Sequence, residues 1–495
     1  MSPLQPSPSC DTVRVAMQSD PVPGLLSRAT ERLREQFAHL PAILDTGPDA
    51  IGHLTADYTA VLDETARRLG DNYPYFHPLY AGQMLKPPHP VARAAYALAM
   101  AINPNNHARD GGRASSEMEV EAVSGLAAMF GWTGDGYLGH LTSSGTLANL
   151  EALWVAGLTD PGKRIVGSAQ AHYTHQRISA VLKLEYTSIA ADHRGRMDLG
   201  ALETELRKGG VGTVVVTLGS TAMGAVDPLD RIVELRSRYH FRIHVDGAYG
   251  GYFKLIPEAL DEPARRAFAA IDQADSIVVD PHKHGLQPYG CGCILFRDPA
   301  VGSFYRHDSP YTYFTSKELR LHPSEQRPLA GGPVHLGEIS LECSRAGASA
   351  VALWATQQLL PLTPGGDFAL GLAAGRRAAT ELDRRLREDP EGRFDPLPAG
   401  LPELDIVVWK VRAATLHRSS ELAQSIFAAC AARNLHLALV QLPKCWFELP
   451  DNPARHTQME FVTCLRSVLM KPEHEIWLER IWTEFVEASR DVLAR

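Results

Sequence analysis

The chain has 495 residues, of which 45% are hydrophobic and 21% are charged. This balance is typical of a soluble globular protein, and the length suits one large domain with a smaller one. The net charge is −8, and the charges are scattered along the chain without a basic run. The sequence therefore favours neither nucleic acid nor an anionic membrane as a partner.

The seven cysteines have irregular spacing and include no C-x-x-C pair. We expect free thiols in a reducing cytoplasm, with no disulfide framework and no bound metal. Residues 1–25 are rich in proline and serine and lack the apolar core of a signal peptide. No apolar run approaches the roughly 18 residues that a membrane helix needs. These features predict a cytoplasmic protein.

The sequence divides into four predicted segments. Residues 1–22 are predicted to be disordered, and residues 23–85 to form an N-terminal helical segment that runs into an aromatic, proline-rich loop. A large domain is predicted for residues 86–362 and a small C-terminal domain for residues 363–495. In the small domain, "LDIVVWKVR" and "LHLALVQL" predict a short sheet with flanking helices.

Between residues 138 and 300, short apolar runs alternate with helical stretches. The runs "RIVGS", "GTVVVTLG", "FRIHVDGA", "DSIVVDPHK" and "CILFRD" are rich in β-branched residues and bounded by Gly, Asp or Pro. This pattern predicts a mostly parallel sheet with helices on both faces. In such sheets, functional groups lie just past the carboxyl ends of the strands. Three runs end in chemically capable residues, at Thr217–Thr221, Asp246 and Lys283.

Lys283 follows a strand that we expect to be buried. A buried lysine needs a charged partner or loses its charge, and a lowered pKa would let the neutral amine attack a carbonyl. A solvated surface lysine is the alternative. Asp246 can pair with a pyridinium nitrogen and keep it protonated, or it can simply end a strand. The small side chain of Ala248 would let a flat ring lie against the backbone.

Two further motifs complete the pattern. "LTSSGTLAN" (141–149) is a Ser/Thr/Gly loop that enters a helix, so it can bind a phosphate or merely cap the helix. His172 follows a predicted strand and can stack on a flat ring or serve a structural role. A phosphate loop, a histidine, a strand-end aspartate and a strand-end lysine, in that order, together predict a pyridoxal phosphate (PLP) site.

The motifs "GHLTSSGTLANLEALWVA", "AQAHY", "HVDGAYGGYF" and "VDPHK" resemble those of the group II PLP-dependent amino-acid decarboxylases. The resemblance extends from about residue 70 to 365 and more weakly to the end. It implies an α/β protein of PLP fold type I, the aspartate-aminotransferase-like fold, with a mostly parallel mixed sheet in the large domain and a smaller C-terminal α/β domain. Within the group, "GSTAMGAVDPLDRIV" and "DPHKHGLQPYG" look most like the bacterial tyrosine decarboxylases.

The resemblance assigns roles at matching positions. It implies that Lys283 binds the aldehyde carbon of PLP, that Asp246 pairs with the pyridine nitrogen, and that His172 and Ala248 contact the two faces of the ring. The other cofactor-binding positions that it implies are Ser143, Ser144, Thr221, Asp280 and His282. The family usually has asparagine, and in some members aspartate, where Asp280 stands.

Decarboxylation needs a group that returns a proton to the α-carbon after carbon dioxide leaves. In the family, a tyrosine on a loop after the lysine does so, and "HDSPYTYFTS" offers Tyr311, with Tyr313 as its rival. A surface tyrosine is the alternative interpretation of Tyr311. Phenylalanine at this place would indicate oxidative deamination, so tyrosine favours simple decarboxylation.

The substrate is less well determined by the resemblance. Gln83 stands where tyrosine decarboxylases have histidine, and glutamine can bind either a carboxylate or a phenol. Arg109 and Arg113 are the obvious partners for an acidic substrate, unless they are surface or interface charges. The side chains predicted to line the substrate pocket are Tyr75, Phe76, Tyr80, Gln83, Asn106 and His107. The aromatic members of this set favour an aromatic substrate.

The sequence thus predicts a homodimeric PLP enzyme, with its active site at the subunit interface, that converts L-tyrosine or a related aromatic amino acid to the amine and carbon dioxide. Three alternatives stay open. One is a decarboxylase of glutamate, aspartate or a similar acid. The second is a PLP-dependent oxidative decarboxylase or aldehyde synthase, and the third is a non-catalytic homologue that acts as a binding module.

Overall fold

A computed structural model describes residues 20–39, 58–107, 111–134, 136–305, 340–447 and 460–494. Almost all of the predicted disordered segment 1–22 lies outside these ranges. Arg109, Tyr311 and Tyr313 also lie outside the described residues.

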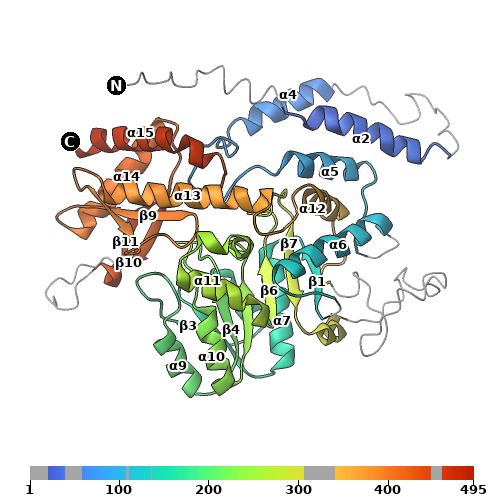
Figure 1. The fold of residues 1–495 in the computed structure, drawn as a ribbon, viewed down its shortest axis with the longest axis horizontal. Coiled ribbons are helices and arrows are strands. Elements are labelled where there is room, and N and C mark those ends of the chain that lie inside the picture. Colours follow the sequence, from blue (N-terminus) through green and yellow to red (C-terminus); the bar gives the residue numbers. More distant parts are fainter. Residues whose placement is uncertain are drawn as a thin grey trace.

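A seven-stranded sheet forms the centre of the larger part of the molecule (Figure 1). Its order is β1-β7-β6-β5-β4-β2-β3, and β7 alone runs antiparallel to its neighbours in this sheet. The strands are β1 (Leu138–Thr142), β2 (Arg164–Ser168), β3 (Tyr186–Ile189), β4 (Val211–Thr217), β5 (Arg242–Asp246), β6 (Ser276–Val279) and β7 (Gly292–Phe296). All residues of β4, β6 and β7 are buried, as expected for strands covered on both faces.

Helices connect and cover these strands. α7 (Gly145–Thr159) packs against β1, β6 and β7, and its buried residues are small or aliphatic apart from Asn149 and Glu151. The other helices of this region are α8 (Thr174–Val181), α9 (Leu199–Arg207), α10 (Leu229–Tyr239) and α11 (Glu262–Ala269). The alternation of strand and helix agrees with the predicted α/β fold.

Five described helices lie beyond the large sheet. α12 (Gly347–Leu359) packs against α5 (Pro90–Met100) and α6 (Arg113–Met129). The helices α2 (Val22–Gln36) and α4 (Tyr58–Leu69) lie above them in Figure 1, and neither buries a residue. Among the helices that the structure describes, none is both long and apolar enough to cross a membrane.

A second, antiparallel sheet forms the smaller part of the molecule, shown in orange and red in Figure 1. Its order is β10-β11-β9-β8. Trp409, Phe394 and Phe485 are buried at its core. Its strands are β8 (Phe394–Leu397), β9 (Ile406–Val411), β10 (Ala438–Pro443) and β11 (Phe461–Val468), and its helices are α13 (Asp367–Arg387), α14 (Leu416–Ala432) and α15 (His474–Leu493).

The aromatic segment before the large sheet is tied to this small sheet. The Ala81 amide donates to the carbonyl of His436 at 2.9 Å, and the Val468 amide donates to the carbonyl of Ala81 at 2.7 Å. Ala81 is fully buried among the apolar residues of the small sheet. A Cβ on the neighbouring Gly82 would lie 2.6 Å from the carbonyl oxygen of Leu437, so the close contact between these two backbone segments requires glycine at this position. The domain boundaries at 85/86 and 362/363 stay predictions.

Packing on α7 gives a test of the fold. Leu153 is fully buried against the sheet, whereas Leu158 on the same helix is 42% exposed. We expect Leu153→Ala to lower the free energy of unfolding by about 2–5 kcal/mol, because it leaves a cavity in the core. Leu158→Ala should change it by no more than about 0.5 kcal/mol. Chemical denaturation of the two variants measures the difference, and equal losses would contradict the described packing.

Candidate active site

The carboxyl ends of β4, β5 and β6 meet at one edge of the large sheet and surround a cavity. Six residues predicted from the sequence lie on its wall: His172, Thr221, Asp246, Ala248, Asp280 and Lys283. The remaining lining residues are Gly145, Thr146, Asn149, Thr174, Thr217, Gly219 and Tyr249. The structure therefore brings together residues from four separate motifs.

Lys283 lies in the turn that follows β6, with its side chain 22% exposed. Its Nζ is 3.0 Å from Oδ2 of Asp280. Burial acts to lower the pKa of Lys283, but the negative charges of Asp280 and Asp246 outweigh burial and raise the pKa above its usual value. The expectation that the pKa of Lys283 is lowered is thus wrong for this arrangement, because the carboxylate of Asp280, three residues earlier, stabilises the charged form of the lysine.

Asp246 ends β5 and is 5% exposed. Its Oδ2 lies 2.7 Å from Nε2 of His175, and its Oδ1 accepts a hydrogen bond from the Ala248 amide at 3.1 Å. Burial acts to raise the pKa of Asp246, yet the hydrogen bond and charge of His175, with Lys283, hold the pKa well below its usual value. Asp246 is therefore ionised at neutral pH. Sequence reasoning missed His175, although its separation from His172 by three positions places both at the start of α8.

His172 and Ala248 lie on the cavity wall, as their predicted contacts with a flat ring require. Nδ1 of His172 is 2.8 Å from the hydroxyl of Thr174, which orients the imidazole. Burial lowers the pKa of His172, although Asp246 opposes this shift, so the ring is neutral at neutral pH. A neutral imidazole can stack on a heteroaromatic ring without burying a second cation beside Lys283.

The predicted phosphate loop leads into α7. Ser144 caps this helix, because its Oγ accepts a hydrogen bond from the Leu147 amide at 3.2 Å. The Ser143 amide donates to a carboxylate oxygen of Glu342 at 2.8 Å, so the loop already binds one anionic group. Gly145 and Thr146, which follow Ser144, line the cavity, whereas Ser143 and Ser144 do not. Their amides belong to the first turn of α7, which has no intrahelical acceptors, and the turn suits an anion.

Asp280 and Gly145 face each other across the cavity floor. Asp280 is 3% exposed, and its Oδ1 has no hydrogen-bond partner within the described ranges. A Cβ on Gly145 would lie 2.4 Å from that oxygen. His282, also predicted here, donates from Nδ1 to the carbonyl of Cys291 at 2.7 Å, and its Nε2 is 3.5 Å from Asp280.

These groups fit the chemistry of PLP. An ionised carboxylate suits a pyridinium nitrogen, an amine suits an aldehyde, and the free amides of a helix suit a phosphate. The hydroxyl of Thr217, buried and unpaired among the described residues, adds a donor on the same wall.

An aromatic cluster lies beside Lys283. Tyr75 and Tyr80 pack edge to face, with ring centroids 4.9 Å apart. Tyr289, which sequence reasoning missed, stacks on His282 at a centroid distance of 4.9 Å and lies close enough for its charge to interact with Lys283 and Tyr75. Its position in "HGLQPYG", just after the lysine, was the available signal. Phe76, predicted with this set, is 52% exposed.

Gln83 contacts an arginine from the small sheet. Nη1 of Arg466 in β11 donates to Oε1 of Gln83 at 3.2 Å. Arg466 is 3% exposed, and its Nε and Nη2 have no hydrogen-bond partner in the part of the chain that the structure describes. Sequence reasoning missed this arginine, since nothing in the local sequence links β11 to a segment 383 residues earlier.

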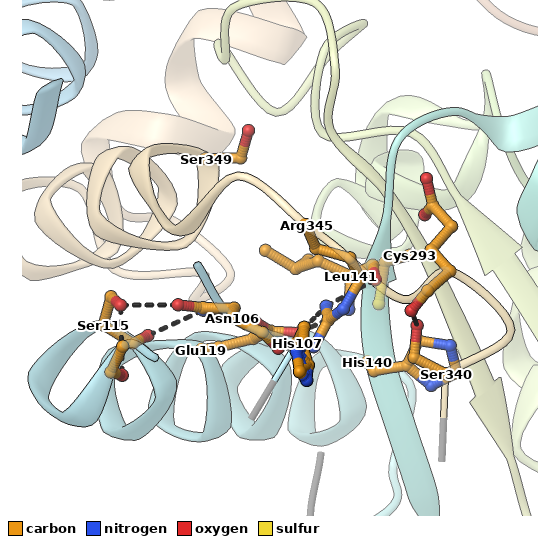
Figure 2. Close-up of polar contacts among 12 residues, drawn as sticks. Asn106, His107, Ser115, Glu119, His140, Leu141, Cys293, Ser340, Arg345 and Ser349 are labelled. Carbon is orange, nitrogen blue, oxygen red and sulfur yellow. Dashed lines mark hydrogen bonds and ion pairs between the residues drawn. The ribbon is translucent and has the colours of Figure 1, made fainter. Parts of the chain in front are cut away.

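Asn106 and His107 lie away from the cavity wall, next to a buried ion pair. Figure 2 shows Arg345 between Asn106 and Leu141, at the end of β1. Arg345 pairs with Glu119 at 2.6 Å and donates to the carbonyls of Leu141 and Asn106. The Asn106 side chain, 1% exposed, donates to Glu119 at 2.6 Å. The Asn106 side chain thus forms its hydrogen bonds within the network that holds β1 in place, just before the phosphate loop.

None of the six predicted substrate-pocket residues lines the described cavity.

Gly145 offers a test of this geometry. In Gly145→Ala, the new Cβ must displace Asp280, the partner of Lys283. Such overpacking costs about 1–3 kcal/mol, so we expect PLP to bind about tenfold more weakly or worse. Gly136→Ala is the matched control, because its nearest atom would be 3.8 Å away. Fluorescence titration of the two apoproteins with PLP measures both constants. Unchanged affinity in Gly145→Ala would exclude this cavity as the cofactor site.

Comparison with known proteins agrees with this geometry. Residues 38–303 match the pyridoxal-dependent decarboxylase conserved domain. The chain is 28% identical to the L-tyrosine decarboxylase of Enterococcus faecium, over 76% of this chain and 77% of that protein. It is 30% identical to the probable L-tyrosine/L-aspartate decarboxylase of Methanoculleus marisnigri, over 73% of this chain and 86% of that protein. It spans 63% of the length of a third relative, the L-tyrosine decarboxylase of Levilactobacillus brevis.

The fold is shared with solved structures. A crystal structure of Oryza sativa TDC with PLP and tryptamine matches with a TM-score of 0.72 at 17% identity, over 96% of this chain and 98% of that one. This similarity confirms the predicted fold class. Together with the domain match, it shows that the chain belongs to the pyridoxal-dependent decarboxylase family, as a PLP-dependent amino-acid decarboxylase.

Proposed function

We propose that the enzyme converts L-tyrosine, or a closely related aromatic L-amino acid, to the corresponding amine and carbon dioxide. The observation that carries this proposal is the group of Tyr75, Tyr80 and Tyr289, in which Tyr289 lies close enough to Lys283 and to Tyr75 for electrostatic interaction. Edge-to-face and offset contacts with such rings favour an aromatic substrate side chain over an aliphatic one. The names of the relatives from Enterococcus faecium and Levilactobacillus brevis support the same substrate.

In this proposal, four residues hold the cofactor ring. Lys283 would bind its aldehyde carbon, Asp246 would accept a hydrogen bond from its protonated pyridine nitrogen, and His172 and Ala248 would contact its two faces. PLP supplies an electron sink that weakens the bonds at the α-carbon of the substrate. The protein selects the bond to the carboxylate by orienting the substrate.

The phosphate group would bind at the amino-terminal end of α7. Ser143, Ser144, Thr221 and His282 keep their predicted roles around it, and the first amides of α7 add donors. Lys283 reacts with an aldehyde only as a free amine, so one proton must leave Nζ. Oδ2 of Asp280, 3.0 Å from Nζ, is positioned to accept it.

Gln83 and Arg466 provide polar recognition in this proposal. Because Oε1 of Gln83 accepts from Arg466, its amide nitrogen remains as a donor. Such a donor suits the phenolic oxygen of tyrosine. The unpaired N–H groups of buried Arg466 suit a carboxylate. The same two residues favour a second candidate, an acidic amino acid, which the name of the relative from Methanoculleus marisnigri includes.

The substrate is tested by carbon dioxide release and amine formation from PLP-loaded enzyme. We expect turnover of L-tyrosine to exceed that of L-aspartate and L-glutamate, and Lys283→Ala to abolish it. Gln83→Leu should lower kcat/KM for tyrosine by about 10-fold more than for phenylalanine, because only tyrosine loses a hydrogen bond. Faster turnover of the acids would replace the aromatic proposal with the acidic one.

Tyr311 lies outside the described residues, and its role as proton donor stays a prediction of the sequence, as do the homodimer and the cytoplasmic location. We expect Tyr311→Phe to bind PLP normally while amine formation falls about 100-fold or more, the usual contribution of general acid catalysis. Tyr313→Phe is the matched control. Product analysis should also detect aldehyde and ammonia in the first variant. Normal amine formation by Tyr311→Phe, with a loss in Tyr313→Phe, would transfer the role to Tyr313.

A further inference from the structure

A buried contact at the edge of the large sheet that bears the cavity joins His175 and Asp246. His175 is fully buried, and its Nε2 lies 2.7 Å from Oδ2 of Asp246. The pair links α8 to the end of β5. His175 is not itself on the cavity wall, whereas Asp246 is. Any effect of His175 on a bound cofactor therefore passes through Asp246.

The protonation states follow from the surroundings. Asp246 is ionised, so it accepts and Nε2 of His175 donates. Nδ1 of His175 has no partner among the residues that the structure describes. The other charged or titratable groups facing Asp246 are Lys283, His244 and His172.

His244 does not compete with His175 as the hydrogen-bond partner of Asp246. Burial lowers the pKa of His244 to about 3, so it is neutral, and its two nitrogens contact Ser276 at 2.9 Å and Asn149 at 2.8 Å. Its ring centroid is 6.1 Å from that of His175. A neutral His244 cannot keep Asp246 ionised. His172 is neutral as well, and its Nδ1 contacts Thr174. Of the three neighbouring imidazoles, His175 is the one that lies within hydrogen-bond distance of the carboxylate.

We propose that His175 is a positioning residue: its Nε2–H fixes Oδ2 of Asp246 and keeps this carboxylate ionised on the cavity wall, ready for the pyridine nitrogen of PLP. The inference rests on the role of Asp246 in the proposed function. A purely structural role for His175 is the competing explanation. It predicts a loss of stability without any change in the cofactor.

A second buried histidine provides the control for that explanation. His140 lies 2.7 Å from Glu151, both side chains are 0% exposed, and neither residue lines the cavity. The two pairs match in distance and burial, and they differ in that only the Asp246 carboxylate faces the cavity. Removing either histidine leaves a buried carboxylate without its partner, so the stability cost of the two variants should be similar.

The experiment compares His175→Leu, His175→Gln, His140→Leu and Asp246→Asn with the unsubstituted protein. Two readouts do not depend on turnover: the dissociation constant of PLP, and the absorbance spectrum of the bound cofactor as a function of pH. We expect His175→Leu to weaken PLP binding about 10-fold or more and to shift the spectral titration. His175→Gln, which keeps a donor, should restore both in part, and His140→Leu should leave both unchanged.

The outcomes separate this inference from the assignment of Asp246. If Asp246→Asn changes the cofactor but His175→Leu behaves as His140→Leu does, the inference is overturned and the assignment stands. If Asp246→Asn changes nothing, both fail. NMR of the unsubstituted apoprotein labelled with 15N-histidine gives a check that needs no variant. A His175 Nε2 without a proton would also overturn the inference.

Discussion

The parallel direction of β2, β4, β5 and β6 is the constraint on which the active site depends. Parallel strands end at the same edge, so residues far apart in the sequence meet there without any long loop. β1 is separated from β6 by the antiparallel β7 and therefore runs in the same direction as β6. The same edge thus receives the amino-terminal end of α7, which adds helix amides to a cluster of carboxylates and an amine.

Buried charge at this edge is stabilised in pairs. Asp246 has His175, Asp280 has Lys283, and Glu119 has Arg345 behind the phosphate loop. Removing one partner of a buried pair typically costs about 3–5 kcal/mol, because the other charge is left uncompensated. In the proposed function, the Asp280–Lys283 pair differs from the other two, because binding of the PLP aldehyde would require its lysine to give up the proton. That pair would then be broken and re-formed, whereas the others can remain fixed.

Much of the fold and part of the site could be predicted from the sequence. Asp246 ends the run "FRIHVD", and Lys283 lies in the turn after the apolar run Ile277–Val279, so their place at the strand ends is encoded locally. The sequence of β1, "LGHLT", contains no run of β-branched residues, so its residue pattern does not predict a strand. The contacts of Asp246 with His175 and of Gln83 with Arg466 join residues 71 and 383 positions apart. Such contacts depend on how whole elements pack, which residue types and spacing do not specify.

The attachment of the segment around Ala81 to the small sheet has a consequence for evolution. Ala81, which lies between Tyr80 and Gln83, is held by main-chain hydrogen bonds to His436 and Val468, while Lys283 follows a strand of the large sheet. In the proposed function, substitutions in the small sheet can therefore shift the groups that recognise a substrate without disturbing those that bind PLP. Such an arrangement lets one scaffold diversify its amino-acid preference while its bond-breaking chemistry stays constant. Libraries aimed at new substrates should accordingly vary β11 and the turn before β10.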